Sequence, residues 1–326
     1  MKVLLFNPEN DMALADGHSG YTPPKHIRQM RRDLWDLPAL WAKEGDFVWD
    51  GETPLHLREG DEILPWGWSP ALCHQLRLKG VEENFLPTAE ELERRRSLSH
   101  RRTAVEALSL LRGESVLGGR TCGHSTLCTS MEEVLEAVSQ WPQALLKAPW
   151  SSSGKGLQAW GMPEAERWAA HILQQQGSVI VEEWLHKRFD FAMEFWKEGK
   201  GDAAFRGLSL FSTNEKGAYT GNLLATEEEK RERIAQWVKP SILEGLAQWW
   251  EGYLADFEYK GPVGVDMMVC TDGSICPCIE TNWRHTMGMV AILLAEKGLR
   301  GRFSICHENG RFQAKIDSES PDTTVF

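Results

Sequence analysis

Residues 144–157 predict a strand, a loop of small residues and a second strand, and this pattern constrains the fold of the chain most. The first strand ends at Lys147, and the loop reads Ser151-Ser-Ser-Gly-Lys-Gly156. Backbone N–H groups of such a loop can point at phosphate oxygens, which a nearby lysine can neutralise. Taken alone, the loop is equally compatible with an ordinary hairpin turn.

Two familiar phosphate-binding loops do not fit these residues. A Walker A loop needs G-x-x-x-x-G-K-[ST], but Pro149 stands where the first glycine should be and Gly156 follows Lys155. A dinucleotide fingerprint needs G-x-G-x-x-G before a helix, whereas the third glycine is missing here and the following residues predict a strand. The segment is therefore interpreted as a flexible loop between two strands.

Residues 263–282 predict a hairpin across the turn Thr271-Asp-Gly273, and this hairpin carries three oxygen ligands. Asp266 lies in an apolar strand, where an unpaired carboxylate is costly. Glu280 and Asn282 are two residues apart on the other strand, so they point to the same face. Such ligands suit one or two Mg²⁺ ions that bridge nucleotide phosphates. The alternative is that these acids pair with surface Lys or Arg.

The bulk composition of the chain limits the classes of protein to which it can belong. The chain has 326 residues, 42% hydrophobic and 25% charged, which is typical of a soluble globular protein with two or three subdomains. A net charge of −11 argues against nucleic acid as a partner. No apolar run approaches the roughly 18 to 20 residues that span a bilayer, and no signal peptide is recognisable. The seven scattered cysteines favour reduced thiols, so we expect a cytoplasmic protein without a membrane partner.

Three parts are expected along the chain: a small α/β domain at 1–96, a second part at 97–180 and a third at 181–326. Apolar runs and turn signals predict the secondary structure. The expected strands are 2–6, 47–49, 62–64, 115–117, 126–128, 145–147, 157–160, 178–183, 191–196, 203–210, 263–269 and 274–279, and the expected helices are 27–41, 99–111, 130–138, 163–176, 227–253 and 286–296.

The order of these motifs resembles that of the ATP-grasp superfamily, which includes D-alanine–D-alanine ligase, biotin carboxylase and glutathione synthetase. The resemblance covers roughly residues 97 to 300. The segments that carry it are, in order, Lys147, Gly154-Lys-Gly156, Val181-Glu-Glu-Trp-Leu185, Asp190-Phe-Ala-Met-Glu194, Asp266 and Glu280-Thr-Asn282-Trp-Arg284.

The resemblance implies an α/β (α+β) ATP-grasp fold, in which ATP binds between two α+β subdomains and residues 1–96 form the preceding small domain. It also implies a ligase that uses ATP and one or two Mg²⁺ ions, for which Mn²⁺ can substitute. Such a ligase joins a carboxylate to an amine or thiol through an acyl-phosphate. The expected substrates are small-molecule or peptide carboxylates and amines, and a homodimer is possible.

Roles for individual residues follow from the same resemblance. The nucleotide-binding residues would be Lys147, Ser153, Gly154, Lys155 and Gly156 at the phosphates, Glu182, Glu183, Trp184 and Leu185 at the adenine, and Asp190 at the ribose. Asp266, Glu280 and Asn282 would bind the metal, with Arg284 and Lys155 as catalytic residues. Where the family usually has a second nucleotide lysine, this chain has Arg101, with Arg102 as the alternative; an arginine can still bind phosphate.

The sequence is also compatible with two other functions. One is a kinase of the same fold that phosphorylates a small molecule, although Arg284 suits an acyl adduct better than an alcohol acceptor. The other is a non-catalytic nucleotide-binding module. For the acceptor substrate, the polar loops Asn7-Pro-Glu-Asn-Asp11 and Tyr21-Thr-Pro-Pro24 are candidate contacts, because open α/β sheets tend to bind ligands there.

Overall fold

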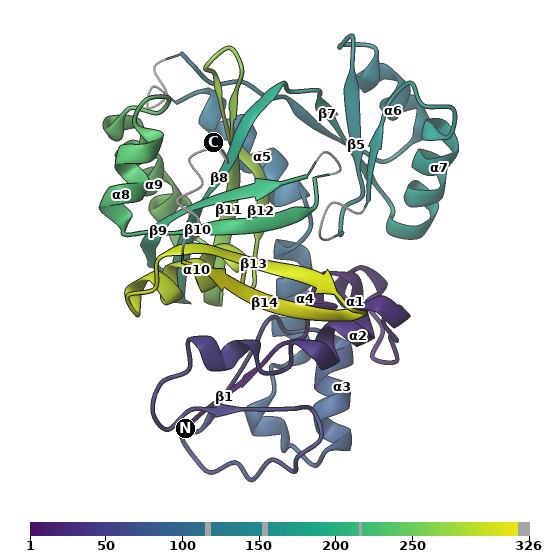
Figure 1. Cartoon of the computed structure of the whole chain (residues 1–326). Coiled ribbons are helices and arrows are strands. Elements are labelled where there is room, and N and C mark those ends of the chain that lie inside the picture. Colours follow the sequence, from purple (N-terminus) through teal and green to yellow (C-terminus); the bar gives the residue numbers. More distant parts are fainter. Residues whose placement is uncertain (115–118, 152–155, 215–216, 319–326) are drawn as a thin grey trace.

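The computed structural model describes residues 1–114, 119–151, 156–214 and 217–318, which form three sheets with helices packed on them. The first sheet lies at the bottom of Figure 1 and is parallel, in the order β2-β1-β3. In its central strand, Val3, Leu4 and Leu5 are apolar and buried, as expected for a strand covered on both sides. The elements of this part are β1 (Lys2–Leu5), α1 (Asn10–Asp16), α2 (Lys25–Asp33), β2 (Phe47–Val48), β3 (Glu62–Pro65), α3 (Pro70–Leu78) and α4 (Ala89–Leu98).

The second sheet has four antiparallel strands in the order β4-β7-β5-β6 and carries the glycine loop between β5 and β6. Two helices cover it, and their apolar sides bury Val134 and Ala169 against Leu146 and Val181. Its elements are β4 (Ser125–Cys128), α6 (Met131–Val138), β5 (Ala144–Lys147), β6 (Leu157–Ala159), α7 (Ala165–Gln176) and β7 (Val179–Glu183).

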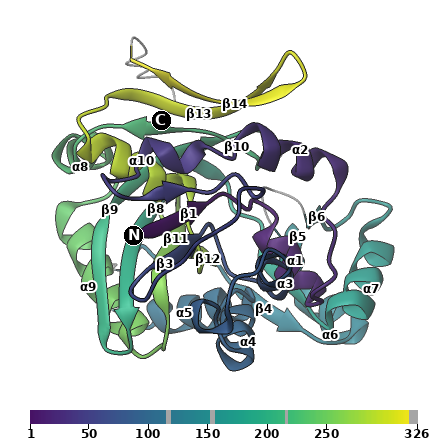
Figure 2. The ribbon, with the colours of Figure 1, turned by 90° about the horizontal axis from the view of Figure 1, so that it is seen from below.

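The third sheet is the largest, with seven antiparallel strands in the order β12-β11-β8-β9-β10-β13-β14. Figures 1 and 2 show its last two strands extending over the first domain. The strands are β8 (Lys187–Gly199), β9 (Asp202–Thr213), β10 (Tyr219–Leu224), β11 (Lys260–Cys270), β12 (Ile275–Asn282), β13 (Gly301–Glu308) and β14 (Arg311–Asp317). The helices packed on this sheet are α5 (Arg102–Arg112), α8 (Glu227–Ile234), α9 (Pro240–Ala255) and α10 (Met287–Glu296).

The two faces of the large sheet differ in chemistry because side chains alternate along each strand. On β8, Phe191, Met193 and Phe195 face the main apolar core, which α5, α8 and α9 complete. On the opposite face, α10 and the first domain form a smaller apolar cluster that includes Phe6 and Trp66. That face also carries the polar side chains described below.

Most predicted elements are present, and the differences have local causes. The helix expected at 27–41 ends at Asp33, and a 3₁₀ turn follows at Leu37–Leu40; Pro38 lacks the N–H that a continuing helix requires. The helix expected at 227–253 is two helices, and Pro240 is the first residue of the second, where its fixed φ is favourable. The strands β10, β13 and β14 were not predicted. The strand expected at 115–117 lies outside the described residues.

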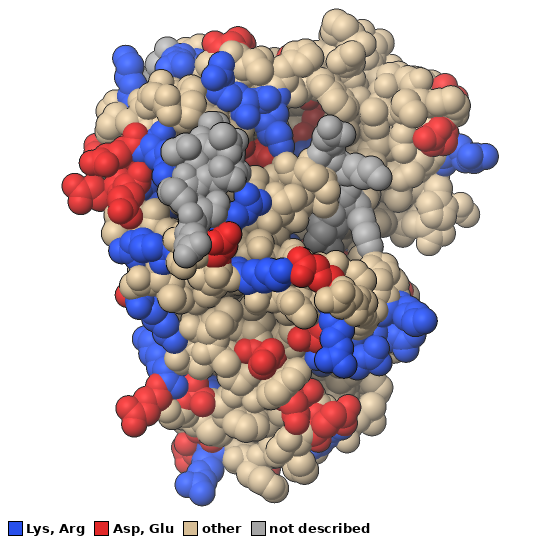
Figure 3. Space-filling view, viewed as in Figure 1, with Lys and Arg blue, Asp and Glu red and all other residues tan. Residues whose placement is uncertain are grey.

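The domain boundaries proposed at 96/97 and 180/181 stay predictions; α4 spans the first and β7 the second. No helix in the described part of the chain is long and apolar enough to cross a membrane. On the face shown in Figure 3, the Lys and Arg side chains lie in several separate groups among Asp and Glu side chains.

Candidate active site

The three predicted metal ligands meet on the polar face of the large sheet. Asp266 on β11 lies directly opposite Glu280 on β12, and Gly264 lies opposite Asn282. The Asn282 amide Nδ2 donates to Asp266 Oδ2 at 3.1 Å. The alternation inferred from the sequence is therefore present in the sheet.

The electrostatics of this group fit a bound divalent cation. Burial, with a further contribution from the facing Glu280 carboxylate, raises the pKa of Asp266 to about 7. A cation between the two carboxylates would remove this repulsion, and oxygen ligands are those that Mg²⁺ prefers. Among the described residues, no three His, Cys, Asp or Glu side chains cluster for a metal. The site would consequently rely on two carboxylates and the Asn282 amide.

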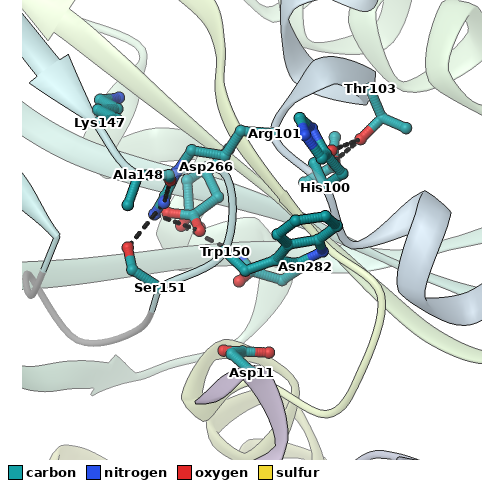
Figure 4. Close-up of polar contacts among 12 residues, drawn as sticks. Asp11, His100, Arg101, Thr103, Lys147, Ala148, Trp150, Ser151, Asp266 and Asn282 are labelled. Carbon is teal, nitrogen blue, oxygen red and sulfur yellow. Dashed lines mark hydrogen bonds and ion pairs between the residues drawn. The ribbon is translucent and has the colours of Figure 1, made fainter. Parts of the chain in front are cut away.

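Arg101 connects the metal hairpin to the start of the glycine loop (Figure 4). Its guanidinium donates to Glu280 Oε1 at 2.8 Å and to Ser151 Oγ at 2.7 Å, and its side chain is only 6% exposed. The Arg101 backbone N–H donates to the Pro149 carbonyl at 3.0 Å. Arg102 is exposed and donates to Ser97 Oγ at 3.3 Å. Of the two arginines considered from the sequence, Arg101 is the one that lies in the site.

Lys147 forms a buried ion pair with Glu182 on the neighbouring strand. Its Nζ lies 2.6 Å from Glu182 Oε2, and the two side chains are 5% and 18% exposed. Both charges act on the Cys276 thiol, which lies on β12 of the large sheet. Burial is the main cause that raises the pKa of this thiol to about 12; Glu182 contributes to the rise and Lys147 opposes it. The lysine and the metal hairpin thus approach the same region from different sheets.

The glycine loop is closed at its base by a backbone hydrogen bond. The Ala148 N–H donates to the Gly156 carbonyl at 2.8 Å. Ser153, Gly154 and Lys155, which the sequence assigned to ATP phosphates, lie outside the described residues. Gly156 itself has a φ of +75°, and a Cβ there would lie 2.6 Å from Ser151 Cβ. Only glycine adopts this geometry without strain.

We therefore expect Gly156→Ala to impair the loop. A left-handed alanine costs roughly 1–2 kcal/mol, and the collision with Ser151 adds to that cost. The variant should lower ATP-dependent turnover about tenfold while its unfolding temperature stays within a few degrees of the parent. The matched control is Gly161→Ala, where φ is +93° but the added Cβ would meet nothing within 4 Å. Equal activity of the two variants would show that the Ser151 contact is unimportant.

Of the remaining predicted nucleotide contacts, the side chains of Glu183, Leu185 and Asp190 already have partners in the protein. His124 Nδ1 lies 3.1 Å from Glu183 Oε2, and Trp184 is 40% exposed. Leu185 packs against the main core. The Asp190 carboxylate accepts from Lys187 Nζ at 2.7 Å and Thr213 Oγ1 at 2.8 Å. A ribose at Asp190 would therefore compete with these two groups.

Arg284, the predicted catalytic arginine, is held by the first domain. Its Nε and Nη2 donate to the Asp11 carboxylate at distances between 2.7 and 2.9 Å. Arg284 Nη2 also donates a hydrogen bond to Asn282 Oδ1 at 3.1 Å. Arg284 lies beside the metal group as expected, but its pairing with Asp11, which is 273 residues away, was not predicted from the sequence.

A cavity of about 450 Å³ lies next to the metal group, between the first domain, the large sheet and the β13–β14 hairpin. Of the two loops proposed for substrate contact, the first contributes Pro8 and Asp11, whereas residues 21–24 do not line the cavity. The polar and charged lining residues are Asp11, Glu194, Ser209, Thr213, Tyr219, Asn222, Asp266, Glu280, Asn282, Arg284, Thr286 and His307, and the larger apolar ones are Phe6, Met30, Trp66, Phe211, Met287, Ile305 and Phe312.

Glu194 is the last residue of the segment Asp190-Phe-Ala-Met-Glu194, which resembles an ATP-grasp motif, but no role was predicted for it. It lies on β8 two residues beyond Ala192, it is 1% exposed, and it lines the cavity. The pKa of its carboxyl is raised to about 8, mainly by burial and also by the Asp266 charge, although a hydrogen bond from Thr286 and the charges of Arg284 and Lys230 oppose the rise. The even, four-residue spacing from Asp190 was the available signal, since it places both side chains on the same face of the strand.

Glu194 should make folding stability depend on pH. The folded protein keeps this proton up to about pH 8, while the unfolded chain loses it near the ordinary value of 4.5. Stability is therefore lost as pH rises between these values, by about 1.4 kcal/mol per pH unit at most. In urea unfolding, Glu194→Gln should gain stability over the parent as pH rises from 5 to 8. A difference that stays constant over this range would contradict the raised pKa.

The comparisons with known proteins bear on the fold. No family model and no curated protein matches this sequence. Among solved structures, the biotin carboxylase domain dimer of 2-oxoglutarate carboxylase from Hydrogenobacter thermophilus is similar, with a TM-score of 0.50 and 15% identity over 74% of this chain. This chain has the ATP-grasp fold. The fold class predicted from the sequence is confirmed.

Two further solved structures are similar to this chain at lower TM-scores. The phosphoribosylamine–glycine ligase of Thermotoga maritima has a TM-score of 0.49 and 14% identity, covering 95% of this chain and 81% of the ligase. D-cycloserine synthetase has a TM-score of 0.48 and 14% identity, covering 91% of this chain and 98% of that one. The chain spans only 55% of the length of the carboxylase domain. That domain was crystallised with MgADP, ADP and bicarbonate.

Proposed function

We propose that this protein is an ATP- and Mg²⁺-dependent ligase that joins a carboxylate to an amine or thiol through an acyl-phosphate. A substrate carboxylate oxygen attacks the γ-phosphorus of ATP, and ADP leaves. The nucleophile then attacks the acyl carbon and phosphate leaves, with the proton of the nucleophile released. The substrates are small-molecule or peptide carboxylates and their acceptors.

The observation that carries this proposal is the shared location of the metal group and the cavity. Asp266, Glu280 and Asn282 lie on one face of the large sheet, and all three line a cavity large enough for a small substrate. Phosphoryl transfer needs cations at the phosphates and a space for the acceptor beside them. A nucleotide-binding module without catalysis would not need that second space.

Within this proposal, the buried cations bind ATP. Lys147 and Arg101 are now paired with Glu182 and Glu280, at 2.6 and 2.8 Å. Phosphate oxygens could replace these carboxylates as the partners of both cations, so that neither cation would be left buried without a negative partner. Glu182 would then accept from the adenine amino group. Mg²⁺, held by Asp266, Glu280 and Asn282, would supply charge neutralisation on the phosphates.

Arg284 would stabilise the negative charge of the acyl-phosphate and its adduct. It already lies between Asp11 and Asn282 and lines the same cavity as the metal ligands. The sequence resemblance supports further proposed contacts with the nucleotide. These are Ser153, Gly154, Lys155, Gly156, Glu183, Trp184, Leu185 and Asp190.

The test is an assay for ADP and inorganic phosphate with ATP, Mg²⁺ and a panel of carboxylates and amines. A ligase should release both products only when a matching acid and acceptor are present together. ADP release without phosphate, with a phosphorylated acceptor as product, would favour the kinase. If ATP binds but no pair in the panel promotes ADP release, the ligase proposal loses its support.

A further inference from the structure

Two thiols from distant parts of the chain lie next to each other at the turn end of the β11–β12 hairpin. Cys122 Sγ is 3.4 Å from Cys270 Sγ, although 148 positions separate the two residues in the sequence. Both are free cysteines; Cys122 is partly exposed, and Cys270 is 4% exposed. An S–S bond is about 2.0 Å long, so a small approach of the two sulfur atoms would bring them to bonding distance.

Backbone hydrogen bonds hold the two segments that carry these thiols. The Cys122 N–H donates to the Ile275 carbonyl at 3.0 Å, and Thr121 forms an isolated parallel bridge with the same residue. The Cys270 N–H donates to the Ser274 carbonyl at 2.9 Å within the turn of the hairpin. Because the backbone fixes both segments, the two thiols are neighbours as a result of the fold and not of one side-chain rotamer alone.

The two thiols differ in their readiness to ionise. A hydrogen bond from Cys122 lowers the pKa of the Cys270 thiol; burial opposes this effect, a bond from Ser274 supports it, and the charges of Asp272 and Glu183 oppose it. The same hydrogen bond, together with burial, raises the pKa of Cys122. The thiolate is the form of cysteine that attacks an oxidant. Cys270 is therefore the nucleophile of the pair, and Cys122 is placed to act as the resolving thiol.

Other buried thiols of the chain have the opposite character. Burial raises the pKa of Cys73 and of Cys128 to about 11 and that of Cys276 to about 12. These thiols stay protonated at neutral pH, and a protonated thiol is a poor nucleophile. Selective oxidation is therefore expected at the pair and not at these buried sites.

We propose that Cys122 and Cys270 form a redox-active dithiol, which a hydroperoxide oxidises to a disulfide. The Cys270 thiolate attacks the terminal peroxide oxygen, the O–O bond breaks, and an alcohol, or water from hydrogen peroxide, leaves with the proton that Cys270 had released. The Cys122 sulfur then attacks the sulfur of the sulfenic acid on Cys270. The S–O bond breaks, and water leaves with the Cys122 proton. The two thiols lose two electrons in total, and the peroxide gains them.

The disulfide would join two segments that both contact residues 183–186, which include proposed adenine contacts. Thr271, the residue after Cys270, donates its N–H to the His186 carbonyl at 2.9 Å. On the other side, the Glu183 N–H donates to the His124 carbonyl at 3.0 Å. In the proposed function, ATP rearranges the ion pairs beside residues 183–186, and a covalent link between their two neighbours would resist this. Oxidation should therefore weaken ATP binding; this consequence rests on the proposed function, whereas the disulfide does not.

Mass spectrometry of the whole protein tests whether the disulfide forms. The reduced protein is treated with hydrogen peroxide, unfolded and alkylated. We expect a mass loss of about 2 Da before alkylation and two fewer alkyl groups than on the reduced protein, because two thiols become one disulfide. After digestion with trypsin, peptide 121–147 should be linked to peptide 261–284. Cys122→Ser and Cys270→Ser should each prevent this link.

Cys306→Ala is the matched control, because Cys306 is partly exposed like Cys122 but its Sγ lies 3.6 Å from the Gln313 carbonyl. This variant should form the disulfide like the parent. Fragmentation of the linked peptides identifies the bonded cysteines in the parent protein, so the test does not depend on the folding of a serine variant. Absence of the link, or a link through Cys128, Cys276 or Cys278, would overturn the inference.

Calorimetry with ATP and Mg²⁺ tests the consequence for the nucleotide site. The oxidised parent should bind ATP at least about threefold more weakly than the reduced parent, and dithiothreitol should restore the affinity. Peroxide should not change the ATP affinity of Cys122→Ser. Unchanged affinity of the oxidised parent would overturn the effect on the nucleotide site. A disulfide in a protein that binds no ATP even when reduced would support the dithiol and contradict the proposed function.

Discussion

Glu280→Gln is expected to reduce Mg²⁺-dependent ADP release by at least about 100-fold, because it removes a carboxylate that would bind the metal directly. The same change removes the negative partner of Arg101, whose side chain is 6% exposed. Activity should be measured across a Mg²⁺ titration, since a weakened site regains part of its activity at high Mg²⁺, whereas a misfolded protein does not.

The control for this variant is Glu296→Gln. Glu296 pairs with Arg206 at 3.0 Å, but both side chains are at least 39% exposed, so the loss of this pair should cost little. Thermal unfolding of both variants separates stability from catalysis. Near-normal turnover of Glu280→Gln at low millimolar Mg²⁺ would remove Glu280 from the metal site.

Lys147→Ala is expected to weaken ATP binding ten- to a hundred-fold, since the phosphates lose a buried cation worth roughly 1.5–3 kcal/mol. The substitution also leaves Glu182 buried without its partner, which lowers stability by itself. The double variant Lys147→Ala, Glu182→Gln removes that uncompensated charge. It should recover stability but not ATP affinity.

Lys79→Ala provides the matched control for Lys147→Ala. Lys79 forms an ion pair with Glu52 at the same 2.6 Å distance, but its side chain is 36% exposed, compared with 5% for Lys147. Calorimetry with ATP and Mg²⁺ should show unchanged affinity for this variant. If Lys147→Ala also binds ATP like the parent, the lysine is structural and serves only to neutralise Glu182.

Local patterns in the sequence predicted the parts of the candidate site that depend on one or two neighbouring strands. The two-residue spacing of Glu280 and Asn282 fixed their common face, because strand alternation is a local property. The two strands on either side of the glycine loop followed from apolar runs separated by small residues. Their functional roles stay predictions.

Contacts between segments that are distant in the sequence could not be predicted from local patterns. The pairing of Arg284 with Asp11 depends on how the first domain packs against the large sheet, and no local spacing encodes it. The packing of the buried Glu194 carboxyl is another case, since Gly264 on β11 and Gly288 on α10 leave room for it from two different elements. The strands β10, β13 and β14 were missed because their sequences are mixed in polarity, and their stability comes from pairing with neighbours.

The wide sequence separation of the site contacts has a consequence for how the protein acquires its binding capacity. Arg101 meets Glu280 across 179 residues, and Arg284 meets Asp11 across 273. Contacts of such long range form late in folding. The chain must first lose the conformational entropy of closing a long loop, and only then do the contacts stabilise the structure. While the chain is synthesised, the four-stranded sheet with Lys147 can fold before β12 exists. Nucleotide affinity should therefore appear only with the last third of the chain, which makes ATP binding a reporter of completed folding.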